Sequence, residues 1–423
     1  MKRILPEGRL ICLACLLMGT SLVAHPDNAF GNKDTGRERT LDWNTVKQLV
    51  TSHPALAAAE YQIEAAQNRV GSATAADNPE LEGAVGYGRA RDGDQTRVEW
   101  GISLSIPLDW IARRNAQGDA ARALVKSAEQ EKAVLKRDIL LALRLLFVDV
   151  LYHQQRVRVF ESLAEEGDRL SRLVDARVQN GESRSVEAVQ MRVEAEKISA
   201  ALVLARAELQ ISRDRLGVWL ASPPGTVILA TGDVSALPAE PSTDREKMEH
   251  SIAQHPIYGL AEAELAVAAA SARREEREKI PAFAMTPFFD SELDRRAFGV
   301  GVSMSLPLWN RNRGNIDAAR SQIKSREASL ENVKRELQGN LLEYQTSCRA
   351  AIAVAARFRD VILPDADTAA STMRRTWELG ETTLFEVISA NRMRIEVQLE
   401  LVSAFERAQQ SCSRFSIAAG EEL

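Results

Sequence analysis

Few residues of this chain could carry out chemistry, and their spacing matches no catalytic or metal-binding pattern. The 423-residue sequence holds five histidines and four cysteines. It shows no Ser/His/acid order, no glycine-rich phosphate loop and no cluster of metal ligands. The sequence therefore predicts a protein that is not an enzyme, with no catalytic residue, no cofactor and no metal site.

Two histidines share one local context. His53 precedes Pro54, and His255 precedes Pro256, 202 positions later. Proline suits the first position of a helix, because its missing N–H has no helical partner there. We therefore interpret His53 and His255 as helix-start residues in preference to metal ligands.

The cysteines are too few to support a fold. Cys12 and Cys15 lie in the N-terminal segment, so only Cys348 and Cys412 would remain in an exported chain. Two cysteines make neither a disulfide framework nor a metal cluster. We interpret both as ordinary small residues on helices.

The N-terminus has the layout of a secretory signal peptide. Basic residues precede the apolar run Leu10–Met18, and small residues follow it. We predict a signal peptide over residues 1–31, with cleavage after Ala24 or after Gly31. The mature chain is therefore expected to be exported.

The overall composition favours long helices. The chain is 45% hydrophobic but only 5% aromatic, and Arg and Glu are interspersed as on solvated helix faces. A net charge of −5 gives no electrostatic case for nucleic acid as a partner.

A strand-to-helix junction occurs twice. Residues 101–122 and 301–320 each begin with apolar/polar alternation, meet a proline, pass basic residues and enter a helical pattern. We predict β-hairpins over 80–107 and 282–307. The junction residues are Pro107, Arg113 and Arg114 in the first copy and Pro307, Arg311 and Arg313 in the second.

A long helical pattern follows each hairpin, over about 114–179 and 314–379. Each has some 66 residues, or roughly 100 Å of α-helix, which implies coiled-coil packing. Pro364 predicts a local kink in the second. Each pattern ends at a glycine, Gly181 or Gly380, that can close a helix in the left-handed conformation.

Return helices are expected over about 185–220 and 383–418. Thr383 and Glu386 fit a capping box for the second, whereas Arg184 replaces the threonine in the first. We thus predict a first repeat over 32–220, an equatorial linker over 221–243 and a second repeat over 244–423.

The hairpins raise the question of what closes the sheet. Four strands in one chain leave open edges, which are a liability in an exported protein. Closure by several copies would give a barrel with an apolar outer face, the way in which strands span an outer membrane. The arginines at the junctions would then be interfacial anchors at the membrane boundary.

In its ordered double set of elements, the chain resembles the TolC-like outer-membrane efflux proteins. The motif R-x-x-x-x-G-E-T-x-x-x-E-V over Arg375–Val387 belongs to this resemblance. Within the family, S-L-P-L-W-N-R-N-R-G-N-I over Ser305–Ile316 is most similar to the CzcC-type subunit of cobalt-zinc-cadmium cation efflux systems.

The resemblance implies a mainly α fold with a small β part. A long-helix α-barrel would continue a twelve-stranded transmembrane β-barrel, closed by a homotrimer in outer-membrane lipid. It also implies a tripartite machine, in which an inner-membrane, proton-driven pump of the RND type and a periplasmic adaptor (membrane fusion) protein feed this exit duct. The expected cargo is heavy-metal cations.

The resemblance also places a closed aperture at the periplasmic tip, where the helices turn. Relatives often carry charged residues near Thr382 and Ser389, so a lock of that kind is not expected here. A ring of Glu386 or Glu187 could attract cations, although Glu386 could simply cap its helix. The aperture candidates are Gly181, Glu182, Arg184, Glu187, Trp377, Gly380, Thr382, Glu386 and Ser389.

Other functions stay open at this point. A multidrug or type I secretion duct would have the same architecture. A periplasmic coiled-coil scaffold would explain the long helices but not the amphipathic hairpins.

Overall fold

The computed structural model describes residues 38–89, 96–108, 110–223, 225–233, 235–242, 244–292, 295–306 and 308–420. The predicted signal peptide, residues 1–31, and the predicted junction residue Pro307 lie outside these ranges. The described chain is mainly helical with a small β part, as predicted.

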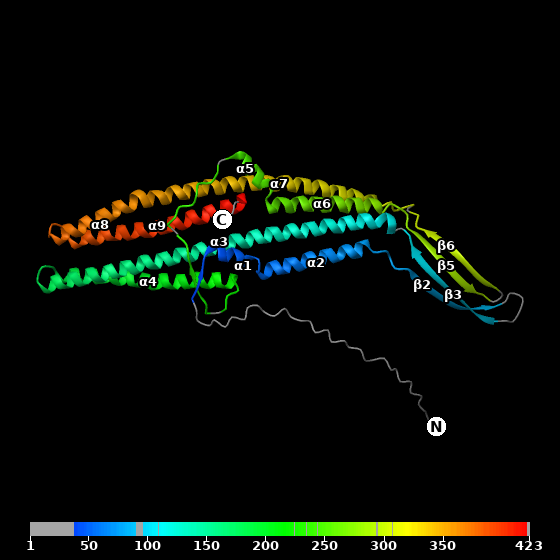
Figure 1. The fold of residues 1–423 in the computed structure, drawn as a ribbon, viewed down its shortest axis with the longest axis horizontal. Coiled ribbons are helices and arrows are strands. Elements are labelled where there is room, and N and C mark those ends of the chain that lie inside the picture. The colour runs from blue at the N-terminus through cyan, green and yellow to red at the C-terminus, as the bar shows by residue number, and fades with distance from the viewer. Residues whose placement is uncertain are drawn as a thin grey trace, which may run out of the picture.

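The molecule is elongated, with the four long strands at one end and two helix-to-helix turns at the other (Figure 1). The end of the last helix lies near the middle of the long axis. In chain order the elements are β1 (Glu38–Leu41), α1 (Trp43–Val50), α2 (Pro54–Thr74), β2 (Glu80–Arg89), β3 (Thr96–Pro107), α3 (Trp110–Gln179), α4 (Ser185–Trp219), β4 (Val227–Ala230), α5 (Arg245–Ala253), α6 (Pro256–Arg277), β5 (Phe283–Ser291), β6 (Arg296–Met304), α7 (Arg313–Arg357), the π-helix η1 (Phe358–Ile362), α8 (Leu363–Glu378) and α9 (Leu384–Ala419).

Both long helical patterns form helices. Helix α3 has 70 residues, or about 105 Å at the α-helical rise. The second runs through α7, η1 and α8, and the interruption expected at Pro364 takes the form of the five-residue π-helix just before it. Among the helices within the described ranges, none combines the length and the apolar character needed to cross a membrane.

His53 and His255 cap the starts of α2 and α6, as predicted. The Nδ1 atom of each accepts a hydrogen bond of 3.2 Å from the backbone N–H two residues later. Burial, and then the charge of Arg137, lower the pKa of His255 to about 4. Nδ1 of His255 therefore remains an acceptor at neutral pH.

The two hairpins join into one antiparallel sheet of order β2-β3-β5-β6. Strand β3 pairs with β5, with Ile102 opposite Phe289. The observed strands agree with the predicted hairpins, except that β6 ends at Met304. Within the described chain, β2 and β6 remain the open edges of this sheet.

Large apolar side chains of the sheet face outward, not into a core of the chain. Phe298 is 88% exposed, and Val85, Tyr87, Val300 and Val302 are also exposed. Burying such side chains in a nonpolar environment is favourable, by about 1.5–3 kcal/mol for a fully covered Val or Phe. The sheet is therefore built to be covered by something other than this chain.

The linker between the halves contains structure that the sequence did not indicate. Strand β4 pairs in parallel with β1, with Leu41 opposite Ala230. The side-chain amide of Gln154 donates to Ala230 O and accepts from Ala230 N, each at 2.9 Å. These bonds hold the first part of the linker against α3.

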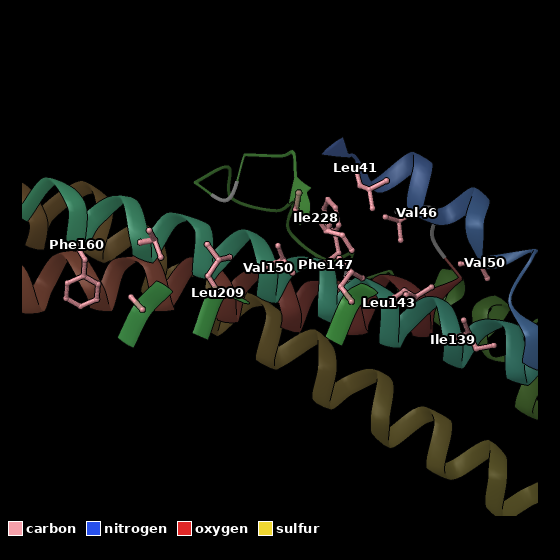
Figure 2. Packing of buried hydrophobic residues seen from close by; sticks show 14 of the residues in the cluster. Leu41, Val46, Val50, Ile139, Leu143, Phe147, Val150, Phe160, Leu209 and Ile228 are labelled. Atoms are coloured by element: carbon pink, nitrogen blue, oxygen red, sulfur yellow. The ribbon is translucent and has the colours of Figure 1, made fainter. Parts of the chain in front are cut away.

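The largest hydrophobic cluster lies where α1, α3, α4 and the β1–β4 pair meet (Figure 2). Phe147 and Leu143 of α3 and Ile228 of β4 are almost fully buried. The cluster lies halfway along α3 because strands β1 and β4 cover the apolar face of the helix there.

The interpretation of the cysteines was wrong. Cys348 of α7 and Cys412 of α9 form a disulfide with a Cα–Cα distance of 4.7 Å. Their spacing of 64 residues carries no local signal of pairing, because the two helices that hold them meet only in the folded chain. Closing a loop of that length is worth about 4 kcal/mol in the chain-entropy model.

Candidate functional site

The end of the molecule opposite the sheet is formed by two tight turns. Gly181 follows α3 with φ 76°, and Gly380 follows α8 with φ 80°. In each turn the N–H after the glycine bonds the carbonyl five residues back, Glu182 N to Arg177 O at 2.8 Å and Glu381 N to Thr376 O at 2.9 Å. This is the Schellman geometry that the two glycines predicted.

Arg177 joins the two turns. Its guanidinium lies 4.2 Å from the centre of the Trp377 ring and donates to the backbone oxygens of Trp377, at 3.3 Å, and Glu378, at 3.0 Å. Arg177 thereby adds a side-chain donor to two carbonyls in the last turn of α8, where Trp377 O also accepts from the Gly380 N–H at 2.9 Å.

A small apolar cluster lies directly inside the tip and unites both halves. Trp377, an aperture candidate, is only 4% exposed. Its neighbours come from the other three helices that meet there, α3, α4 and α9, and are Leu170, Val174, Ala188, Met191, Leu384, Val387 and Ile388. Trp377 is therefore part of the apolar core of the tip.

Glu386 caps α9. Its Oε2 accepts from the Thr383 N–H at 2.9 Å and the Thr383 hydroxyl at 3.1 Å, and also from the Thr382 hydroxyl. The predicted capping box is present. The Thr382 hydroxyl, followed by the two Thr383 groups, lowers the pKa of Glu386, so the exposed carboxylate is ionised at neutral pH.

The first turn is organised differently. The side chain of Arg184 makes no cap to α4, as expected from the missing threonine. It lies 3.1 Å from Glu187 Oε1 through both Nε and Nη2. The charge of Glu187 is therefore balanced within its own turn, whereas Glu182 and Ser389 are simply exposed.

Ion pairs connect the halves above the tip. Arg392 of α9 holds Glu194 of α4, with Nε 3.0 Å from Oε2, and this bond lowers the pKa of Glu194. Arg394 bonds Glu166 of α3, and Arg374 of α8 lies 3.6 Å from the same carboxylate. None of these pairs was expected, because each joins residues about 200 positions apart.

At the junction with the sheet, Arg113 of α3 contacts the residues that follow α6. Pro107 ends β3, as predicted. Arg113 lies 3.3 Å from Glu278 and donates to Ile280 O at 2.9 Å. Arg114 is half-buried near the start of α3, and Arg311 and Arg313 are exposed.

Asn312 is the junction residue that sequence reasoning missed. Its φ of 55° is left-handed. Its amide donates to Glu275 O at 2.9 Å and to Glu275 Oε2 at 3.0 Å, while Asn310 Oδ1 accepts from its backbone N–H. Asn312 therefore fastens the start of α7 to the end of α6, and Asn310 and Asn315 of the N-R-N-R-G-N segment hydrogen-bond to Asn312. That repetition was the available signal, because asparagine tolerates left-handed backbone.

The described side chains offer no resident metal site. Across these ranges, no three or more His, Cys, Asp or Glu residues are grouped so as to hold a metal ion. The chemistry that the tip can supply is limited to charge and shape, with Glu386 as its exposed carboxylate.

The sequence of this chain is similar to those of known efflux and metal-resistance proteins. A family model described as outer membrane efflux protein matches residues 45–221 and 259–421. The cobalt-zinc-cadmium resistance protein CzcC of Cupriavidus metallidurans is 25% identical over 361 residues, which cover 85% of this chain and 84% of that protein.

Solved structures share the fold. A membrane protein from Pseudomonas aeruginosa superposes with a TM-score of 0.75 at 16% identity, covering 89% of this chain and 92% of its own. The CusC structure gives 0.76 at 16% identity, with 93% and 96% covered. VceC of Vibrio cholerae gives 0.72 at 16% identity, with 90% and 96% covered.

Proposed function

Because the chain belongs to the outer membrane efflux protein family, we propose that it is the exit duct through which a tripartite system expels heavy-metal cations. As a family member it is an outer-membrane efflux channel that extends into the periplasm. The cargo, the assembly and the partners are the proposed parts.

The assembly proposed is a homotrimer in outer-membrane lipid. The exposed apolar side chains of the sheet support contact with lipid tails, because each loses its contact with water there. The open edges β2 and β6 support pairing with neighbouring copies, since unpaired strand edges do not persist in a membrane. Three copies would supply twelve strands in a closed barrel and join their helices into the α-barrel.

The partners proposed are an inner-membrane RND-type pump, driven by protons, and a periplasmic adaptor. Membership of the outer membrane efflux protein family supports these partners. The tip, at the opposite end from the sheet, is the part that would face those partners.

The cargo proposal rests on one observation, the relation to CzcC along 85% of the chain. That protein's name states cobalt, zinc and cadmium resistance. Passage of a hydrated cation needs favourable charge more than tight ligands, because a tight site would hold the ion in the duct. Glu386, ionised and exposed at the tip, supplies such charge.

Deletion of the gene tests the cargo. We expect growth of the deletion strain to fail at lower zinc, cobalt or cadmium concentrations than growth of the parent, with tolerance restored by the plasmid-borne gene. Dyes and detergents serve as the comparison. Lost dye tolerance with unchanged metal tolerance, in a strain without a second homologue, would assign a multidrug duct and reject the cation cargo.

A separate measurement tests the duct itself. The purified protein should require detergent and run as a trimer. A detergent-free soluble monomer would favour the periplasmic scaffold, and a secretion defect for a co-encoded protein substrate would favour type I export.

A further inference from the structure

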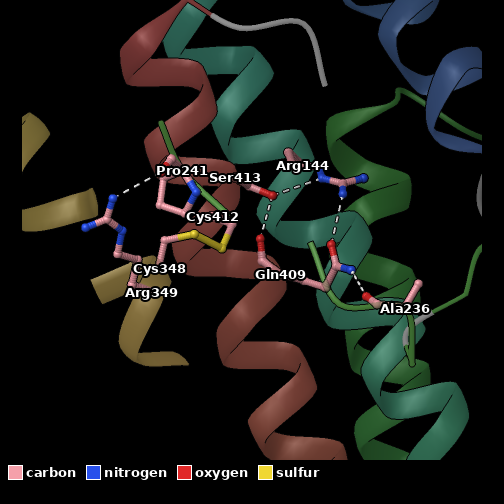
Figure 3. The surroundings of a disulfide bond; sticks show 8 residues. All are labelled: Arg144, Ala236, Pro241, Cys348, Arg349, Gln409, Cys412 and Ser413. Atoms are coloured by element: carbon pink, nitrogen blue, oxygen red, sulfur yellow. Dashed lines mark hydrogen bonds between the residues drawn. A yellow bond between two sulfur atoms is a disulfide. The ribbon is translucent and has the colours of Figure 1, made fainter. Parts of the chain in front are cut away.

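The disulfide lies where the linker crosses the second half of the chain. Cys348 and Cys412 tie α7 to α9, and residues 236–242 of the linker run beside them (Figure 3). The bond closes a loop that contains η1, α8, the turn at Gly380 and most of α9.

Both disulfide-bearing helices donate hydrogen bonds to the linker. Gln409, three residues before Cys412, donates to Ala236 O at 2.8 Å. From α7, Arg349 donates to Pro241 O at 3.3 Å, and Gln345 donates to Ser242 O. The linker thus bridges α9 and α7. Its carbonyls can accept from all three donors only while the two helices keep their positions along each other.

Helix α5, which follows the linker, packs against the hydrophobic cluster around the disulfide. Ile252 of α5 belongs to the hydrophobic cluster that contains both cysteines, and Met248 packs against it. Cys348 is 1% exposed and Cys412 is 6% exposed. A thiol oxidant can reach these sulfurs only before the linker and α5 have docked.

The first half of the chain is anchored at the same level. Arg144 of α3 donates to Ser413 at 3.1 Å and to Gln409 at 3.3 Å, and its guanidinium lies 4.9 Å from the Trp43 ring. Gln409 therefore contacts both Arg144 of the first half and the linker. A shift of α9 along its axis would change the contact between the two halves.

We propose that oxidation of Cys348 and Cys412 is a maturation step that precedes, and permits, docking of the linker and α5. The oxidant is a protein disulfide of the compartment that receives the exported chain. One thiolate attacks that disulfide and forms a mixed disulfide, releasing one oxidant thiolate. The second cysteine thiolate then attacks the mixed disulfide and releases the other. The chain loses two electrons and two protons, and the oxidant becomes a dithiol.

The test compares tryptic cleavage in α5 of the full-length protein, purified in detergent, with and without the bond. In C348A/C412A, which keeps the site apolar, we expect cleavage after Arg245 and Lys247 to be faster by about tenfold, because cleavage follows local opening. Cleavage after Arg184, exposed in the first turn, is the internal control and should not change. Equal cleavage after Arg245 in both proteins would overturn the proposal.

Refolding of the wild-type protein gives a test that does not depend on the variant. Reduced, denatured protein is refolded into detergent with a disulfide oxidant, and samples are alkylated and treated with trypsin at intervals. We expect every molecule protected at Arg245 to carry the disulfide. Protected molecules with two alkylated cysteines would show that docking comes first, and the proposal would be wrong.

Discussion

The guanidinium of Arg177 lies 4.2 Å from the centre of the Trp377 ring, and this contact joins the end of α3 to the end of α8. Arg177 also donates to two carbonyls at the end of α8. Trp377 is buried among residues of both tip turns. One side chain of the first half therefore holds the turn of the second half in place.

Replacing Arg177 should loosen the tip. A cation–π contact of this kind is worth about 0.5–2 kcal/mol, so R177A should raise the population of separated turns by about 2- to 30-fold. R177K keeps the charge without the planar fork and should lie between R177A and wild type. The measurement is single-channel conductance in planar bilayers, where R177A should open more often or more widely.

R184A is the matched control, because Arg184 contacts Glu187 of its own turn. If R177A and R184A conduct alike, the contact with Trp377 does not hold the tip together.

Charge reversal should affect ion selectivity unequally at Glu386 and Glu187. Glu386 is exposed, and its carboxylate accepts from hydroxyl and N–H donors of Thr382 and Thr383. Glu187 is already balanced by Arg184. We expect E386K to lower the cation-to-anion permeability ratio by severalfold and E187K to lower it less, because Glu187 is paired with Arg184 whereas Glu386 is held by hydroxyl and N–H donors.

Reversal potentials in asymmetric potassium chloride measure this difference. E386Q, which removes the charge without reversing it, should lie between wild type and E386K. Unchanged selectivity in E386K, together with lower thermal stability, would mean that Glu386 acts only as a cap.

The sequence predicted the parts of this fold that local patterns determine. Alternation located both hairpins, periodicity located the long helices, and Gly181 and Gly380 marked the tip turns within a residue. Each of these features depends on residues that lie close together in the chain.

Features that depend on distant residues were missed. Strands β1 and β4 have four residues each and pair across about 190 positions. The disulfide and the bonds of Arg177 and Arg392 likewise join residues brought together by helix packing. Short strands and single charged side chains carry no periodic signal, so only the folded chain identifies their partners.

Glu406 should make stability depend on pH. Burial, and then the charge of Asp149, raise the pKa of this carboxyl on α9 above its ordinary 4.5. A raised pKa contributes stability that is complete below pH 4.5 and is lost as pH rises through the folded-state value. Above the folded-state pKa, the ionised carboxylate of Glu406 therefore destabilises the fold, and E406Q should remove that cost.

Thermal unfolding at two pH values tests the direction of this effect on stability. E406Q should melt higher than wild type at pH 7.5, with the difference vanishing near pH 4. The groups that act on the Glu406 carboxyl are the charges of Asp149, His153 and Arg407 and the side-chain hydrogen bond of Gln410. E400Q, at an exposed glutamate of the same helix, is the control. A gain for E406Q that is equal at both pH values would exclude the titration of Glu406 as its cause.

Asn312 should be sensitive to substitution for two separable reasons. Its backbone is left-handed, which costs a residue with a Cβ roughly 1–2 kcal/mol but costs glycine nothing comparable. Its amide makes two hydrogen bonds to Glu275, each worth about 1 kcal/mol. N312G should lose only the hydrogen bonds, whereas N312A should lose them and also bear the backbone strain. Denaturant unfolding should therefore rank wild type above N312G and N312G above N312A. Equal stability of N312G and N312A would mean that the start of α7 relaxes out of the left-handed conformation once the bonds to Glu275 are gone.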